Sequence, residues 1–169
     1  MTALASLILM TFPAAMAFAA ANDLFTMRIP NRVSLVLISG FVVVGLLTRM
    51  PLETFGTHVA VGFAVLAAAF GLFSANFLGG GDAKLVAAGA IWMGSEHVVE
   101  YLAYVTIFGG ILALVILGYR NFLPAGAIPL PEWARRLHTT GGPIPYGIAI
   151  AGAGLALFPA TDLFRSLLS

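Results

Sequence analysis

Apolar residues dominate this chain and fall into six runs separated by short polar stretches. The runs cover residues 3–21, 33–48, 59–77, 83–94, 98–119 and 148–157. The longest of them come close to the roughly 20 residues that a helix needs to cross a bilayer. Inside a bilayer the backbone amides of a segment must be bonded within the structure, which favours helices. The pattern therefore predicts an all-α polytopic bundle of six transmembrane helices.

The fourth run, residues 83–94, is too short to cross a membrane by itself. At about 1.5 Å per residue it covers roughly 18 Å of a hydrocarbon core of roughly 30 Å. Either the helix extends backward through Asp82 and the glycines before it, or the bilayer is locally thin. Both options place Asp82 at or below the membrane surface. A tight loop at residues 95–97 is expected to lead into the fifth helix.

The longest polar connection, residues 120–143, contains several prolines and does not read as one helix. Within it, residues 131–137 form an amphipathic pattern with Leu130, Trp133 and Leu137 on one side. Tryptophan next to arginine is typical of the lipid headgroup region. We expect a short interfacial helix between helices five and six that anchors this loop. Contact with a charged segment of a substrate is the alternative role.

The first run resembles a secretory signal peptide, because small residues near its end offer a plausible cleavage site. However, no Lys or Arg precedes the run, and Arg28 and Arg32 follow it closely. Basic residues after the run favour keeping that end in the cytoplasm. We therefore expect a retained first transmembrane helix.

The composition supports a membrane protein and excludes several functions. The chain is 60% hydrophobic and 9% charged, whereas soluble domains have about 25% charged residues. A formal net charge of +1 gives no support for nucleic-acid binding. The absence of cysteine removes disulfides, thiol catalysis and cysteine-held metals. The histidines lie too far apart in sequence for metal-ligand spacing, so we expect no metal site.

The basic residues indicate how the chain is oriented. Six helices place both termini on one side, and the loops of the opposite side carry most of the positive charge. These residues are Arg28, Arg32, Lys84, Arg120, Arg135 and Arg136, against Arg49 and Arg165 on the side of the termini. The richer side is predicted to be cytoplasmic, which leaves the termini extracytoplasmic. Asp23 follows helix one and Asp82 follows helix three, so both acids are expected at the cytoplasmic face.

A carboxylate at membrane depth is costly and often functional, so Asp23 and Asp82 are candidate partners. Two close carboxylates share a proton, and such a pair can activate water and hydrolyse a peptide bond without a cofactor. The structural alternative pairs Asp23 with Arg28, and Asp82 with Lys84 or a headgroup. A transporter is another alternative, although no polar path through the helices and no inverted repeat is evident.

Asp23 followed by Arg28, Ile29, Pro30 and Asn31, together with the GGGDAK segment at residues 79–84, resembles the type IV prepilin peptidases. These are membrane aspartyl proteases with a GxGD motif. The stretch Pro145, Tyr146 and Gly147 is similar to the small CpaA/TadV members that serve Flp/Tad pili. The resemblance covers essentially the whole chain and its six helices.

This resemblance implies that Asp23 and Asp82 are the catalytic pair of an aspartic endopeptidase. Its substrates would be prepilins and pseudopilins with a basic leader followed by a hydrophobic helix. Cleavage would fall just after a Gly, at the cytoplasmic face of the bacterial inner membrane. The implied partners are these substrates, membrane lipid and the pilus assembly machinery, and no cofactor is implied.

One departure from the larger family members affects the expected activity. Those members carry a cytoplasmic domain with paired CxxC motifs, which is associated with N-methylation of the cleaved pilin. This chain has no cysteine. We expect residues 1–169 to form a single transmembrane peptidase domain without methyltransferase activity.

The remaining motif residues have expected supporting roles. The glycines, Gly79, Gly80 and Gly81, are expected to let the chain bend and a substrate backbone approach Asp82. Pro30 biases Ile29 toward extended geometry, and Asn31 is expected to cap the second helix. Lys84 is expected to extend toward the headgroups.

Three rival functions stay open on the sequence. Within the same chemistry, the chain is a peptidase for other membrane substrates, as presenilin-like GxGD enzymes are. Outside it, the chain is a catalytically silent scaffold of a pilus or secretion apparatus, or a small transporter.

Overall fold

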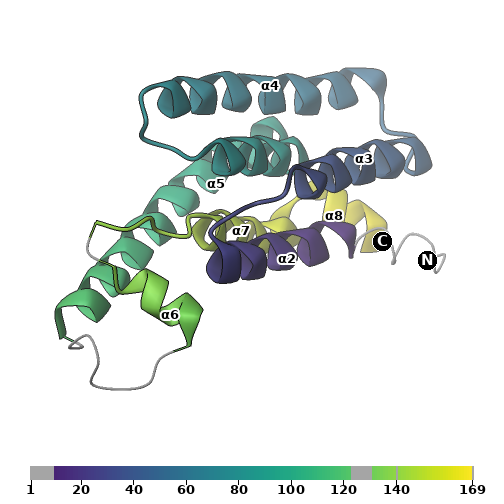
Figure 1. The fold of residues 1–169 in the computed structure, drawn as a ribbon. Coiled ribbons are helices and arrows are strands. Elements are labelled where there is room, and N and C mark those ends of the chain that lie inside the picture. Colours follow the sequence, from purple (N-terminus) through teal and green to yellow (C-terminus); the bar gives the residue numbers. More distant parts are fainter. Residues whose placement is uncertain (1–9, 123–130, 140, 169) are drawn as a thin grey trace.

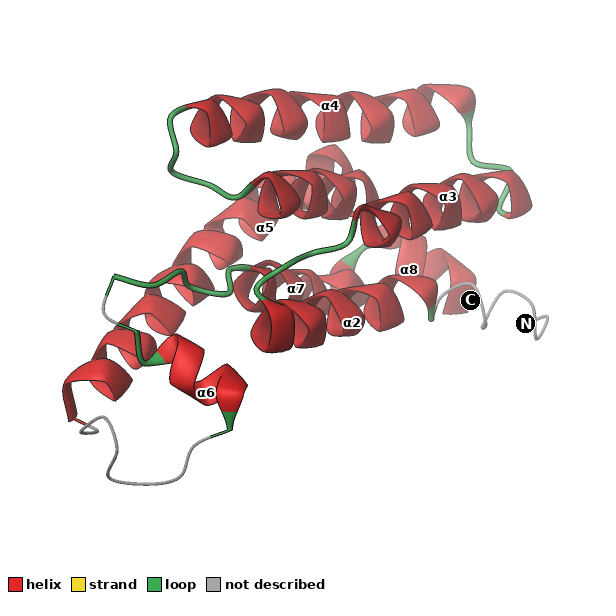
Figure 2. Ribbon diagram, viewed as in Figure 1, coloured by secondary structure: helices red, strands yellow, loops and turns green. Residues whose placement is uncertain are grey.

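The computed structural model describes residues 10–122, 131–139 and 141–168, and that part of the chain is all-α, as predicted (Figure 2). In chain order the elements are α2 (Thr11–Thr26), α3 (Asn31–Leu47), α4 (Leu52–Ser74), α5 (Gly80–Phe122), α6 (Glu132–Leu137), α7 (Gly147–Leu157), the 3₁₀ turn η1 (Phe158–Ala160) and α8 (Asp162–Leu168). Figure 1 shows α4 as an outer helix above α5, and α2 and α7 below α5, on the side of the bundle opposite α4. The short helix predicted between helices five and six is α6.

Aromatic side chains form the core at one end of the bundle. Trp92 is fully buried and packs against Phe12, Phe41 and Phe158, with ring centroids 5.2, 6.0 and 5.8 Å away. Its indole Nε1–H donates a 2.9 Å hydrogen bond to the Leu37 carbonyl, which leaves no polar group of the ring unpaired. Since Phe12 belongs to the first turn of α2, this core lies toward the opposite end of that helix from Asp23.

Two helices of the described chain, α4 and α5, are long and apolar enough to cross a membrane by length and composition. Large apolar side chains on the outer helices are exposed in the isolated chain, among them Phe63 at 68% and Leu114 at 70%. Such surface is unfavourable in water and favourable in lipid, which agrees with the composition of a membrane protein. Helices α3 and α7 are shorter, so the crossing of the bilayer by six helices stays a prediction.

The fourth and fifth predicted helices are the two halves of α5. A sharp break occurs at Gly94, where φ is 65° and ψ is −174°, a conformation that essentially only glycine adopts. The expected loop at residues 95–97 is therefore wrong, because a single residue makes the turn and Ser95 already belongs to the next helical half. At the other end, α5 begins at Gly80. The short fourth helix thus extends backward through Asp82, which was one of the two options.

His58 stabilises the break in α5. Its Nδ1–H donates a 2.7 Å hydrogen bond to the Ile91 carbonyl, one of the last carbonyls of the first half of α5. Its ring also stacks on Phe41, with centroids 5.2 Å apart. The sequence placed His58 in a loop, but α4 begins at Leu52 and includes it. This early start brings the imidazole beside Gly94.

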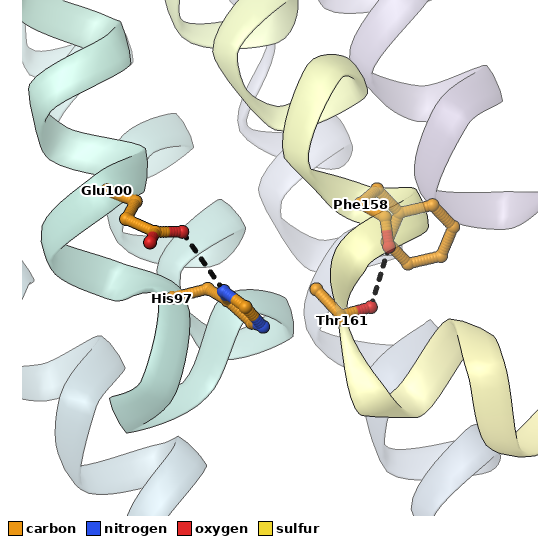
Figure 3. Close-up of polar contacts among 4 residues, drawn as sticks. All are labelled: His97, Glu100, Phe158 and Thr161. Atoms are coloured by element: carbon orange, nitrogen blue, oxygen red, sulfur yellow. Dashed lines mark hydrogen bonds and ion pairs between the residues drawn. The ribbon is translucent and has the colours of Figure 1, made fainter.

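The end of the chain contains a helix that the hydrophobic pattern missed. Thr161 is buried, and its hydroxyl donates a 2.7 Å hydrogen bond to the Phe158 carbonyl, as Figure 3 shows. The same oxygen accepts a 3.3 Å bond from the Phe164 N–H, so Thr161 caps the start of α8. Figure 3 also shows the contact of 3.2 Å between His97 Nδ1 and Glu100 Oε2 on the second half of α5.

We expect Gly94→Ala to destabilise the protein by about 1–3 kcal/mol, because alanine is strained at this φ. Its Cβ would also lie 2.6 Å from Cε1 of His58. Circular dichroism melting in detergent measures the effect. Gly71→Ala is the matched control: it lies inside α4 with no atom within 4 Å of an added Cβ, and it should be neutral or stabilising by up to about 1 kcal/mol. Equal melting of the two variants would contradict the assignment of strain to Gly94.

Candidate active site

A cavity of about 570 Å³ holds both candidate aspartates. It lies between the end of α2, the segment that connects α2 to α3, and the start of α5. Its lining consists of Asp23, Met27, Arg28, Ile29, Pro30, Asn31, Gly79, Gly80, Gly81 and Asp82. Two motifs whose aspartates are 59 positions apart in the chain therefore form the walls of one site.

Asp23 lies in the last turn of α2 rather than in the polar connection expected from the sequence. The helix ends because Met27 takes the left-handed conformation, with φ at 55°, and its N–H closes on the Asp23 carbonyl at 2.8 Å. The Asp23 side chain is buried, with 6% exposed. Its Oδ2 accepts a 2.8 Å hydrogen bond from the Gly147 N–H. Gly147 opens α7, and the first N–H groups of a helix have no partner within it. The aspartate therefore supplies that partner, and the helix dipole favours its charge.

Asp82 is held locally by the start of its own helix. It is the third residue of α5, and its carboxylate accepts a hydrogen bond from the Gly79 backbone N–H. This is the acidic half of a capping box, in which the third helical residue reaches back to the residue before the helix. The acid thus points back toward the glycines and into the cavity.

The two carboxylates interact electrostatically, and one oxygen is left without a partner. Asp82 lies within the field of the Asp23 charge. Among the described residues, Asp82 Oδ1 is buried and accepts no hydrogen bond. A buried carboxylate oxygen without a partner is costly unless it carries a proton or meets a donor. Because like charges disfavour each other's ionisation, a proton on either acid would lower this cost.

Glycines let the walls of the site approach each other. A Cβ on Gly147 would lie 2.9 Å from Asp23 Oδ2, and one on Gly79 would lie 2.6 Å from Asp82 Oδ2. A Cβ on Gly81 would lie 3.2 Å from the Ile29 side chain. The expected flexible bend at residues 79–81 is corrected here, since Gly80 and Gly81 are the first helical residues of α5. Their small size, rather than an unusual backbone, is what the site requires.

A hydrogen bond between Lys84 and Asn31, which lines the cavity, joins the two motifs. The Lys84 ammonium donates a 2.9 Å hydrogen bond to the Asn31 side-chain oxygen. This links the first turn of α5 to the first turn of α3. The expectation that Asn31 caps the second helix is corrected, because Pro30 occupies that position. Lys84 has a protein partner in Asn31, and its contact with lipid headgroups stays a prediction.

Arg120 is a supporting residue that the sequence reading treated only as a topology signal. Its guanidinium donates to three backbone carbonyls, those of Leu137 at 2.7 Å, Gly142 at 3.0 Å and Pro143 at 3.5 Å. These bonds hold the chain that leads to Gly147. Tyr146 packs on Gly109 of α5, where an added Cβ would meet its ring at 2.6 Å. Neither Pro145 nor Tyr146 lines the cavity, so of this stretch only Gly147 bonds to an aspartate.

Helix α6 covers the end of α2 next to the site. Trp133 meets Phe25 edge to face, with centroids 5.9 Å apart, and Arg136 donates a 2.9 Å hydrogen bond to the Phe25 carbonyl. Ala134 and Leu137 are buried. Helix α6 therefore packs on Phe25 of α2, two residues after Asp23. Its contact with lipid stays a prediction. Leu130, expected on the same face, lies outside the described residues.

Residues 10–115 match the Type IV leader peptidase family, and the match includes Asp23, Asp82 and the segments around both. The chain belongs to this family. The matched part is more than half of the 169 residues and ends before Pro145. No curated protein and no solved structure gives a significant match.

Membership of the Type IV leader peptidase family agrees with the resemblance carried by the two motifs. The family is one of aspartic peptidases, and it implies prepilin substrates. Membership of this family also agrees with a membrane protein built of apolar helices. The cavity of this leader peptidase family member is therefore its candidate active site.

We expect Arg120→Ala to loosen the segment that leads to Gly147. Loss of the charged hydrogen bonds should lower the local opening free energy by about 1–3 kcal/mol. Hydrogen exchange of residues 141–147 should accelerate by roughly five- to 150-fold as a result. Hydrogen–deuterium exchange with mass spectrometry in detergent measures it. Arg135→Ala, at an exposed position of α6, is the control and should leave the exchange unchanged. Unaltered exchange in Arg120→Ala would show that other contacts hold this segment.

Proposed function

We propose that the protein is a prepilin peptidase in which Asp23 and Asp82 form the catalytic pair. The observation that carries the proposal is that both carboxylates line one cavity, within the segment that matches the family. A buried, unpartnered oxygen on Asp82 supports a pair that holds one proton between two acids. Glu96 and Asp162 also line a common cavity, but that cavity lies at the break in α5 and contains neither motif.

The proposed reaction is hydrolysis of one peptide bond by water. The ionised carboxylate takes a proton from water, and the resulting hydroxide attacks the carbonyl carbon. The protonated carboxyl donates to the carbonyl oxygen, so the tetrahedral intermediate is neutral at that oxygen. When the C–N bond breaks, the carboxyl that took the proton from water gives it to the amine nitrogen, and the other carboxylate takes a proton from one hydroxyl of the intermediate as the carbonyl re-forms. The products are a carboxylic acid and an amine, and the pair again holds one proton.

The hydrogen bond from Gly147 gives the two acids different surroundings. The Gly147 N–H and the start of α7 favour a negative charge on Asp23. Asp82 accepts a hydrogen bond from the Gly79 N–H, and its Oδ1 is buried without a hydrogen-bond partner among the described residues. The pair nevertheless titrates as a unit. The cavity of about 570 Å³ between the two motifs supports binding of an extended substrate backbone at the two aspartates.

The substrate class follows from family and motif together. We infer Flp-type prepilins and pseudopilins, cut just after the Gly that ends a basic leader, with the chain as a small CpaA/TadV-like member. The distribution of basic residues supports an active site at the cytoplasmic face of the inner membrane and extracytoplasmic termini. The lack of cysteine supports one peptidase domain over residues 1–169 without methyltransferase activity.

We expect Asp23→Asn and Asp82→Asn each to lower the rate of leader removal at least about 100-fold, since each removes one member of an acid–base pair. Co-expression with an Flp-type prepilin, read by the shift of the pilin band on a gel, measures the rate. Asp162→Asn is the matched control, because Asp162 is an exposed aspartate at the start of α8. It should process normally.

Membrane insertion of all three variants must equal that of the wild type. Normal processing by either site variant would refute the catalytic pair. Absence of processing by inserted wild-type protein would instead favour a silent scaffold.

A further inference from the structure

An apolar groove of about 710 Å³ runs along α4 on the side that faces the second half of α5. On α4 its wall is a helical stripe that includes Val61, Ala64, Ala68 and Leu72. From the first to the last of these, the wall extends for roughly 17 Å, or about three helical turns. No charged residue lines the groove, and Thr106 and Tyr146 are its only residues with a polar side chain.

The groove ends beside the catalytic cavity. Leu78 lines the groove, and the next residue, Gly79, lines the cavity and bonds to Asp82. On the other wall Tyr146 lines the groove, and the next residue, Gly147, bonds to Asp23. On each wall, therefore, a residue that lines the groove directly precedes a residue that bonds to one of the two aspartates.

Small residues make this surface a groove rather than a flat face. Ala64 and Ala68 on α4 and Gly110 on α5 all line it, and small residues allow another helix to approach closely in a membrane. Helix α4 itself packs mainly on α5, and only Gly62, Val65 and Ala69 of its 23 residues are buried. Ala64, Ala68 and Leu72 are exposed, so the groove is open to the surrounding phase along this part of α4.

We propose that this groove binds the apolar helix of the substrate, immediately after the bond that is cut. The inference rests on the proposed function. A substrate with a charged leader and an apolar helix must place the junction between them at Asp23 and Asp82. Its apolar part then needs an uncharged surface that begins at the cavity, and this groove begins there. The occupant is a substrate helix rather than a lipid chain, because the two walls converge on the catalytic pair.

Photo-crosslinking tests occupancy. The probe is a synthetic prepilin with a basic leader ending in Gly, followed by about 20 apolar residues, reconstituted with the full-length Asp82→Asn variant in vesicles. A p-benzoylphenylalanine at position 68 should crosslink to the apolar part of the prepilin. The same group at position 67, which is exposed on α4 but outside the groove, should not. Equal crosslinking from both positions, or crosslinking of position 68 to lipid only, would overturn the proposal.

Cleavage kinetics separate the groove from the catalytic pair. In the otherwise native protein, Ala68→Phe fills the groove and should raise KM for the long prepilin about tenfold, with kcat within about twofold. A truncated substrate, with the leader and only five residues after the Gly, should be cut by this variant as by the wild type. Ala67→Phe should match the wild type on both substrates, and Ala64→Phe should repeat the effect of Ala68→Phe.

The outcomes distinguish the two proposals. If Ala68→Phe and Ala67→Phe behave alike, or if both substrates lose equally, the groove does not bind the apolar helix, while the peptidase activity stands. If the wild type cuts neither substrate, the proposed function fails, and the inference that rests on it fails as well.

Discussion

The hydrogen bond from the Gly147 N–H to Asp23 Oδ2 joins residues 124 positions apart. It ties the end of α2 to the start of α7 and so closes the bundle at the end that contains the cavity. A buried carboxylate needs donors, and a helix start needs acceptors, so each satisfies the other at little cost. The rest of the site depends on this closure. Without it Asp23 would have no fixed direction, and Asp82 would face an open end of the bundle.

The two aspartates are positioned by different kinds of contact. Asp82 is set by its own helix start, through the capping bond from Gly79, so the GGGD segment carries its own geometry. Asp23 is set from a distance, by α7 and by the arginine that holds the chain before it. This difference explains why one half of the site reads as a compact motif in the sequence. The other half is spread over Asp23, Arg120 and Gly147.

The all-α class and most of the helices were predictable, because long apolar runs have few alternatives in a membrane. The cavity residues were also predictable as a set, since two short motifs supplied nearly all of them. What escaped were features decided by tertiary contact. The break at Gly94 was placed one residue late because its reason is the imidazole of His58, which belongs to another helix. The sequence predicted Asn31 as a helix cap, but Pro30 occupies the cap position, and the Asn31 side chain accepts a hydrogen bond from Lys84 instead. No local pattern marks Arg120, whose partners are backbone carbonyls.

The break at Gly94 determines how the two halves of α5 are oriented relative to each other. The first half of α5 carries Asp82, and the second half carries one wall of the groove and has Arg120 in its last turn. The backbone torsions of Gly94 therefore set the angle between the part of α5 that carries Asp82 and the part that forms a wall of the groove. The orientation of the groove relative to Asp82 is thus coupled to the torsions at Gly94. A change in those torsions would change how a bound molecule approaches the two aspartates, without altering any residue that contacts them.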